Sequence, residues 1–330
     1  MVDDLLLVEN LSAFYEVKPK PVKAVNNVSF TLKPGEVLGI CGESGCGKTT
    51  LLKAITGLLK EPGYIHEGRI LYHENDLAKL SDREFRKIRW ADISYIPQAS
   101  MNSLNPVLNI RKQMVDTISA HDTDVSETEI VESLKQVLAT VLLSPETLDM
   151  YPHELSGGMK QRILIGLATG AATIRPKIIV ADEPTSNLDV TTERYILKIF
   201  RELIENSETS VLFVTHNIAA QSQIADRLII MYAGEVMEIG EVTGVFSNPL
   251  HPYTQALISA TPSIDTIEKT ISLPGLPPDL RDPPIGCNFH PRCPVAIKGK
   301  CEVEDSETFE VEPGRFVKCH RYMKKGDNQQ

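Results

Sequence analysis

Short apolar runs, separated by turn residues, occupy the first forty positions of the chain. LLLVENL, VNNVSFTL and EVLGI are rich in Val, Ile and Leu, and a Lys33-Pro34-Gly35 turn lies between the last two. Runs of this kind predict β-strands over residues 1–40. The following segment, TTLLKAITGLLK at 49–60, carries apolar residues at helical spacing and predicts a helix.

The pattern changes twice further along the chain. DREFRKIRW, EIVESLKQVLATVLL and GMKQRILIGLATGAA predict amphipathic helices, and residues 100–170 lack strand signals. From residue 176 the strands return, because KIIVAD and VLFVTHN are short apolar runs typical of buried parallel strands, each followed by a helical segment. This order predicts an α/β fold with a helical subdomain at about residues 100–170.

Composition narrows the class of protein. Of the 330 residues, 42% are hydrophobic and 24% charged, which suits a globular core and excludes a disordered chain. The net charge of −10 and the 6% of aromatic residues disfavour a general nucleic-acid binder, although a local basic groove stays possible. No apolar run approaches the ~18 residues of a membrane span, and MVDDLLLVENL is too short and acidic for a signal peptide. We therefore expect a cytoplasmic protein.

One segment matches the phosphate-loop pattern G-x-x-x-x-G-K-[ST] in full: Gly42, Glu43, Ser44, Gly45, Cys46, Gly47, Lys48 and Thr49. It follows a predicted strand and opens a predicted helix, as the pattern requires. Backbone N–H groups of such a loop converge on phosphate oxygens at a helix N-terminus. We expect Lys48 to reach the β- and γ-phosphates, the Thr49 hydroxyl to bind Mg²⁺ and Thr50 to complete the nucleotide site. Cys46 is expected to be a small filler and no nucleophile.

Two carboxylates follow the apolar run at 178–181. Asp182 and Glu183 come at the carboxyl end of a predicted parallel strand, which is the edge of an open sheet where ligands bind. Asp182 is expected to hold Mg²⁺ and Glu183 to orient and polarise the attacking water. His216 stands at the equivalent end of the next predicted strand, where a polar residue can touch the γ-phosphate.

The segment Leu155–Arg162, LSGGMKQR, decides the class. Together with the phosphate loop, ADEPTSNLD at 181–189, Gln98 after ISYIPQ, and His216, it resembles the ATP-binding subunit of ABC transporters over about residues 5–240. Met159 replaces the Gln of the usual LSGGQ signature, a form found in the peptide-importer branch. The resemblance implies an α/β P-loop NTPase core with an antiparallel β subdomain and a helical subdomain.

The resemblance also implies roles for further residues. Tyr15 is expected to stack on adenine, and Gln98 to join the Mg²⁺ shell and sense the membrane subunit. Ser156, Gly157 and Gly158 are expected to bind the γ-phosphate of a nucleotide held by an opposite protomer, and Asp189 to cross the dimer interface. Two chains then sandwich two ATP molecules head to tail. The partners implied are membrane permease subunits, a second ATP-binding subunit of the same or another kind, and indirectly a peptide-binding protein.

Residues 241–330 differ from the rest, because eleven of the 21 prolines fall there and helical periodicity fades. We expect the ATPase domain to end at about 240 and a loop-rich extension to follow. HPYTQALISATPS, LPGLPPDL and GCNFHPRCPVA resemble the C-terminal extension of dipeptide and oligopeptide importer ATPases, with nickel importers carrying related tails. The function implied is ATP hydrolysis that powers peptide import at the cytoplasmic face of the membrane, with a nickel or metal-chelate cargo as the alternative.

Four cysteines crowd this extension: Cys287, Cys293, Cys301 and Cys319. Disulfides are disfavoured in a reducing cytoplasm, whereas thiols packed as small hydrophobes and a metal site both remain open. Their wide spacing suits a [4Fe–4S] cluster better than zinc, which favours close pairs. His290 and His320 are substitute ligands, although exposed loop histidines are the simpler interpretation.

Two other classes of function compete with the importer. A soluble ABC ATPase of DNA repair or translation needs a long coiled coil between the phosphate loop and the signature, or two ATPase units. The interval from 49 to 156 is only about a hundred residues, and one set of motifs exists. A redox-sensing module that uses the cysteine site is the remaining alternative.

Overall fold

The computed structural model describes residues 4–98, 103–121, 124–170, 174–186, 188–206, 209–260, 273 and 275–323. Its contacts divide the chain into two compact units. One, the helical unit, comprises Leu32–Val37 and Lys79–Thr215; the other, the loop unit, comprises Asp4–Thr31, Leu38–Ala78 and the residues from His216 onward. Each is described by itself.

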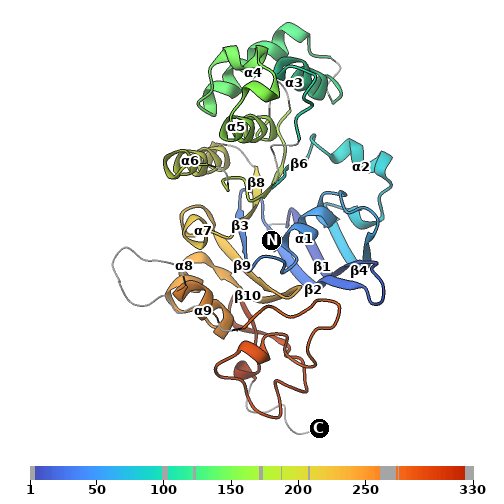
Figure 1. Ribbon diagram of the computed structural model, residues 1–330, viewed down its shortest axis with the longest axis vertical. Coiled ribbons are helices and arrows are strands. Elements are labelled where there is room, and N and C mark those ends of the chain that lie inside the picture. Colours follow the sequence, from blue (N-terminus) through green and yellow to red (C-terminus); the bar gives the residue numbers. More distant parts are fainter. Residues whose placement is uncertain are drawn as a thin grey trace. The chain divides into compact units, whose positions relative to one another are not determined.

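The helical unit combines three parallel strands with a group of helices. Its sheet runs in the order β8-β7-β6, and its elements are α2 (Asp82–Ile88), β6 (Ile93–Ile96), α3 (Ile110–Ser119), α4 (Glu127–Thr140), α5 (Gly157–Ala168), β7 (Ile178–Asp182), α6 (Val190–Asn206) and β8 (Ser210–Val214). Helices α3, α4 and α5 gather together in Figure 1. This confirms the predicted helical subdomain, and β7 and β8 confirm the two predicted parallel strands.

Local sequence explains these elements. Every residue of β7 and β8 is buried, as expected for parallel strands covered on both faces. Helix α4 begins with a capping box, in which Ser126 and Glu129 satisfy each other's backbone N–H groups, and it buries Ile130, Leu134 and Leu138 on one stripe. No described helix is long and apolar enough to cross a membrane.

The loop unit holds two sheets. The antiparallel sheet β2-β1-β4-β5 consists of β1 (Leu6–Tyr15), β2 (Val22–Leu32), β4 (Gly63–Tyr72) and β5 (Asn75–Asp76). It is the predicted antiparallel subdomain. The second sheet runs β11-β12-β10-β9-β3, from β3 (Val37–Cys41), β9 (Arg227–Tyr232), β10 (Glu235–Glu241), β11 (Thr308–Glu312) and β12 (Arg315–Lys318). Its helices are α1 (Lys48–Ile55), α7 (Ile218–Ile224), α8 (Val242–Ser247) and α9 (Pro252–Ser259).

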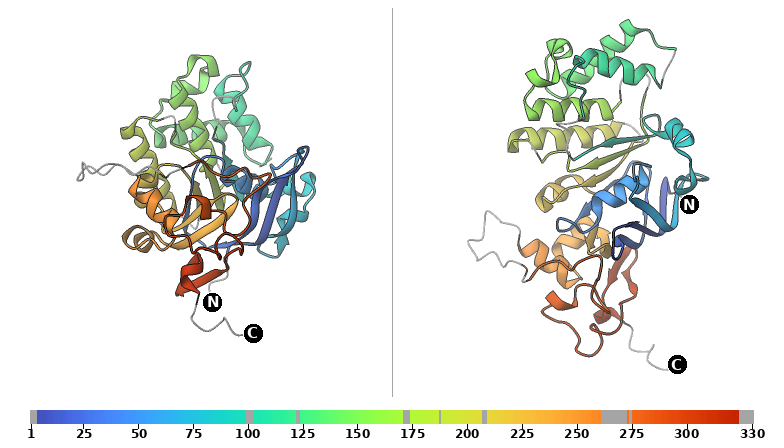
Figure 2. Two further views of the ribbon diagram at one scale, coloured as in Figure 1. Left: turned by 60° about the horizontal axis from the view of Figure 1, so that its bottom comes forward. Right: turned by 45° about the vertical axis from the view of Figure 1, so that its right-hand side comes forward.

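The extension contains a strand pair and a buried aromatic side chain in addition to its loops. Strand β12 pairs with β10, and β11 pairs with β12, so residues 308–318 add a hairpin to the sheet that contains the strand before the phosphate loop (Figures 1 and 2). Phe289 is fully buried in one cluster with Tyr232 of β9 and Tyr253 of α9. Residues 275–307 are otherwise loops and turns with one 3₁₀ turn, as the composition suggests, and the two short strands of the hairpin were not predicted.

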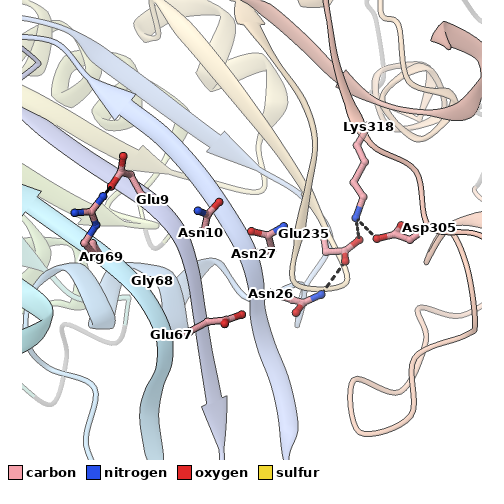
Figure 3. Close-up of a pocket in the computed structure, with 10 residues that line it drawn as sticks. All are labelled: Glu9, Asn10, Asn26, Asn27, Glu67, Gly68, Arg69, Glu235, Asp305 and Lys318. Carbon is pink, nitrogen blue, oxygen red and sulfur yellow. Dashed lines mark hydrogen bonds and ion pairs between the residues drawn. The ribbon is translucent and has the colours of Figure 1, made fainter. Parts of the chain in front are cut away.

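Polar contacts also join the extension to this sheet. Lys318 Nζ lies 2.8 Å from a carboxylate oxygen of Glu235 and 2.8 Å from one of Asp305, and Asn26 Nδ2 donates to Glu235 at 2.8 Å (Figure 3). These groups line a polar pocket of about 660 Å³. None of the residues predicted to bind nucleotide lies in its lining.

The N-terminus of α9 depends on a neutral histidine. His251 caps the helix, because its Nδ1 accepts the Tyr253 N–H at 3.0 Å. Burial, and then the positive charge of Lys318, lower the pKa of His251 to about 3. The unfolded chain binds a proton near pH 6.5 that the folded chain does not bind, so this group makes stability fall as the pH drops from about 6.5 towards 3.

Replacing His251→Asn should flatten that dependence, because Asn keeps a cap acceptor that does not titrate. The measurement is the urea midpoint of unfolding at several pH values between 4 and 7, for the wild type and the variant. We expect the free energy of unfolding, obtained from these midpoints, to depend less steeply on pH in H251N than in the wild type, by up to about 1.4 kcal/mol per pH unit. Equal slopes in the two proteins would contradict the role given to His251.

Candidate nucleotide-binding site

The predicted phosphate loop lies between β3 and α1 in the loop unit, as the pattern requires. Gly47 has φ 107°, and a Cβ there would stand 2.0 Å from the Ala24 carbonyl oxygen. Gly42 has φ 153°, and its Cβ would meet the Met231 carbonyl oxygen at 2.2 Å. Larger residues cannot occupy either position, so the loop's close packing explains these two glycines.

The loop holds its lysine in place. Lys48 is 7% exposed, and its Nζ donates to the carbonyl oxygens of Gly42 at 2.7 Å and Glu43 at 3.0 Å. The buried ammonium is therefore satisfied by loop carbonyls at the N-terminus of α1. Burial raises the pKa of the Cys46 thiol, which keeps it protonated at neutral pH and agrees with a filler role.

Tyr15 and the threonines lie close to this loop. Tyr15 ends β1, and its hydroxyl is 3.3 Å from Thr50 Oγ1 on α1. Thr50 is buried, while Thr49 is half-buried and Ser44 and Gly45 are exposed. The arrangement places the residue predicted to stack on adenine beside the helix that the phosphate loop opens.

A second group of predicted residues comes together in the helical unit, at the carboxyl ends of β6 and β7. Gln98 Nε2 donates to Glu183 Oε2 at 3.0 Å. Asp182 is 1% exposed, and its Oδ2 accepts the Tyr95 hydroxyl at 3.4 Å. Glu183 has φ 50° and donates its N–H to the Val214 carbonyl at 2.8 Å, which fixes its backbone against the end of β8.

The signature segment begins helix α5. Ser156 is its N-cap, with Oγ accepting the Met159 N–H at 3.2 Å, and Gly157 and Gly158 form its first turn. This N-terminus offers backbone N–H groups to an anion. Asp189 caps the start of α6 by accepting from Thr191 and Thr192, and the Thr192 hydroxyl is the main cause that lowers its carboxyl pKa. His216 lies exposed beyond the end of β8.

The four cysteines of the extension were predicted to bind a metal. Cys301 is buried and the other three are half-buried. Within the described ranges, no group of three or more His, Cys, Asp or Glu side chains is arranged to hold a metal ion. The predicted zinc or iron–sulfur site therefore has no support from this arrangement. Burial, followed by the charges of Cys301 and Cys319, raises the pKa of Cys287 to about 11.

The two histidines offered as substitute ligands have other partners. His290 Nδ1 lies 3.0 Å from the Cys287 carbonyl oxygen, and His320 Nε2 lies 2.9 Å from that of Glu304. His320 is 7% exposed, so the expectation of an exposed loop histidine is wrong for it. Its partner Glu304 lies 16 residues away in the chain, so no local sequence pattern indicates this contact.

Sequence reasoning missed three residues that hold site groups. Tyr95 supports Asp182, and the alternation in ISYIPQ, which also places Gln98, is the signal that could have found it. Tyr253 and Arg292 both contact Glu43 of the phosphate loop. They lie 210 and 249 residues away in the chain, so no local pattern indicates them.

Comparisons with known proteins identify the family of this chain. Residues 25–186 match the family model described as ABC transporter, and residues 237–301 match the C-terminal region of oligopeptide/dipeptide transporters. The chain is 39% identical to a dipeptide transport ATP-binding protein of Caldanaerobacter subterraneus, covering 96% of this chain and 97% of that protein. It is 37% identical to the dipeptide transport ATP-binding protein of Escherichia coli, over 96% of each chain.

A solved structure shows the same fold. An ATP-binding cassette in a dimeric, post-hydrolysis state bound to ADP and Pi matches with a TM-score of 0.64 and 28% identity. The match covers 72% of this chain and 98% of the cassette.

Lys48→Ala should abolish nucleotide binding. Among the described residues, Lys48 carries the one buried ammonium group that the phosphate loop holds. We expect ATP affinity to fall by about 100-fold or more, the loss typical of a charged hydrogen-bond donor. Calorimetric titration with ATP measures it, and Lys60→Ala, at an exposed position beyond α1, is the control. Unchanged affinity in K48A would contradict the assigned loop.

Proposed function

Because this chain belongs to the ABC transporter family, in the branch of dipeptide and oligopeptide transport ATP-binding proteins, we propose that it powers peptide import by hydrolysing ATP. The observation that carries the proposal is the likeness along nearly the whole chain, extension included, to dipeptide transport ATP-binding proteins. A nickel or metal-chelate cargo is the alternative, and the peptide relatives favour the main proposal. One set of motifs and a short helical subdomain argue against a DNA-repair or translation ATPase.

The phosphate loop fits a nucleoside triphosphate. Gly47 allows the backbone to turn at the start of α1, and Lys48 is buried with its ammonium at the loop. When bound, Mg²⁺ neutralises phosphate charge, and its proposed ligands here are Thr49, Asp182 and Gln98. Tyr15 supplies a ring for adenine. These roles are taken from family motifs matched residue by residue.

Glu183 is the proposed catalytic residue. Its carboxylate orients and polarises the water that attacks the γ-phosphate, and Gln98 holds that carboxylate through the 3.0 Å hydrogen bond. His216 contacts the γ-phosphate in this proposal. Hydrolysis of this type needs positioning and charge stabilisation more than covalent chemistry, so the fixed backbone of Glu183 serves the reaction.

The N-terminus of α5 binds the nucleotide of a second protomer in this proposal. Ser156, Gly157 and Gly158 supply a hydroxyl and N–H groups, and Asp189 lies at the same interface. The dimeric cassette with ADP and Pi supports such an assembly.

The dimer closes with ATP and opens after hydrolysis, and membrane permease subunits at the cytoplasmic face receive the motion. A peptide-binding protein delivers the cargo to them. The ATPase domain ends near residue 240, and the extension follows it.

Glu183→Gln should keep ATP binding, lower ATP hydrolysis by about 100-fold or more, and trap the closed dimer. Size exclusion with Mg-ATP measures the dimer, for the protein alone and mixed with the importer's second ATP-binding subunit. Adding Ser156→Ala to E183Q should dissolve the dimer, whereas adding Glu202→Gln on the exposed face of α6 should not. Only monomer under every condition would refute the sandwich.

The four cysteines are proposed to bind a [4Fe–4S] cluster of structural purpose. What supports this is the presence of four thiols at wide spacing in one short segment. The described residues show no preformed metal site, but each sulfur accepts a hydrogen bond from a backbone N–H: Cys287 from Phe289, Cys293 from Val295, Cys319 from Arg321 and Cys301 from Ile297. Hydrogen bonds to sulfur are one of the influences that tune iron–sulfur clusters. Zinc is the alternative.

Anaerobically purified protein should contain iron and sulfide and absorb visible light. Iron analysis, zinc analysis and the absorption spectrum together identify the metal. Cys293→Ala should lose the iron, while Cys46→Ala, in the phosphate loop, should retain it. A colourless, iron-free and fully folded wild-type preparation would rule the cluster out.

A further inference from the structure

Glu43 is the second residue of the phosphate loop, and its carboxylate is paired with the extension. Arg292 donates Nη1 to Oε2 at 2.7 Å and Nη2 to Oε1 at 3.0 Å. The Arg292 side chain is 5% exposed and that of Glu43 is 24% exposed. A bidentate pair with this burial fixes both side chains far more firmly than a surface ion pair does.

The backbone of Glu43 is held as well. Its N–H donates to the Tyr253 hydroxyl at 2.9 Å, and its carbonyl oxygen accepts from Lys48 Nζ at 3.0 Å. Tyr253 and Arg292 both come from segments beyond residue 240. The extension therefore fixes one residue of the loop through its side chain and its backbone, and that residue in turn holds the phosphate-binding lysine.

Arg292 itself has little freedom. It ends a short 3₁₀ turn, His290–Arg292, and its guanidinium donates to the Tyr232 hydroxyl at 3.3 Å while lying 5.6 Å from the centre of that ring. Tyr232 packs against Tyr253 with ring centres 4.7 Å apart, and Phe289 packs against both rings. The guanidinium is thus held by an aromatic cluster that links β9, α9 and the extension.

The charge of Glu43 makes this contact matter for nucleotide binding. A carboxylate within a phosphate loop repels the phosphates that the loop exists to bind, and the repulsion is strong where water is partly excluded. Arg292 cancels that charge and fixes its position. Removing Arg292 would leave a loop carboxylate uncompensated and free to turn towards the phosphates.

We propose that Arg292 is a positioning residue for ATP binding: by neutralising and fixing Glu43, it makes the C-terminal extension a determinant of the ATP affinity of the phosphate loop. The proposal rests on the nucleotide site proposed above. Any change that displaces the turn at His290–Arg292 lowers ATP affinity, and bound ATP in return stabilises the extension, because coupling between two sites is reciprocal.

A double-mutant cycle tests it. ATP affinity is measured by calorimetry for the wild type, Arg292→Gln, Glu43→Gln and the double variant. We expect about tenfold weaker binding in R292Q and a smaller loss in E43Q. The double variant should recover and bind ATP more tightly than the single Arg292 variant, because the uncompensated carboxylate is then gone. The deficit of R292Q should also shrink at high salt, which screens charge repulsion.

Controls separate this role from simple loss of structure. Arg281→Gln removes an exposed arginine of the same extension and should leave ATP affinity unchanged. If the contact only holds the fold together, the double variant binds ATP no better than R292Q, and the proposal is overturned. If R292Q does not fold, Arg292→Lys takes its place in the cycle, with an expected threefold loss and the same required recovery.

The outcome also distinguishes this inference from the proposed function. A wild type that binds ATP, together with a K48A variant that does not, establishes the nucleotide site independently of Arg292. Under that condition, R292Q with wild-type affinity overturns the role of Arg292 alone. A wild type with no affinity for ATP overturns the proposed function and the inference together.

Discussion

The loop unit depends on the close packing of the phosphate loop between strand β2 and the turn that joins β9 to β10. On one side, the Gly47 backbone lies so near β2 that a Cβ would stand 2.0 Å from the Ala24 carbonyl oxygen. On the other side, the Gly234 N–H donates to the Cys46 carbonyl at 2.9 Å, and the Gly234 carbonyl accepts the Asn26 N–H at 2.8 Å. Because Gly47 and Gly234 leave no room for a Cβ at these contacts, the backbone of the loop is fixed, and the buried Lys48 donates to its carbonyl oxygens.

The extension continues from this same junction. Tyr232 and Ala233 stand immediately before Gly234, and the aromatic cluster with Phe289 is built on them. The hairpin of β11 and β12 then adds to β10, so the extension shares both a core and a sheet with the loop. The extension therefore belongs to the same compact unit as the phosphate loop, whatever its cysteines bind.

Sequence reasoning predicted the local structure of motifs whose residues lie close together in the chain. Each of these motifs is a run of a few consecutive residues whose types and spacing indicate its chemistry: the loop from Gly42 to Thr49, the strand end at Asp182 and the helix start at Ser156. Gln98 and Glu183 were predicted separately, and the structure joins them. The extension is loop-rich over residues 275–307, as expected from its composition, but composition did not indicate the hairpin of β11 and β12, which contains no proline within its strands and pairs with the edge of β10.

The sequence by itself determined the α/β class, the phosphate loop, the strand-end carboxylates and the signature helix start, since period, turn residues and motif spacing are local properties. Tertiary structure decided which distant residues support them: Tyr95 on Asp182, and Tyr253 with Arg292 on Glu43. Those contacts span 87, 210 and 249 residues of chain. No local pattern encodes such a contact, because it exists only once the strands have paired and the aromatic core has closed around it.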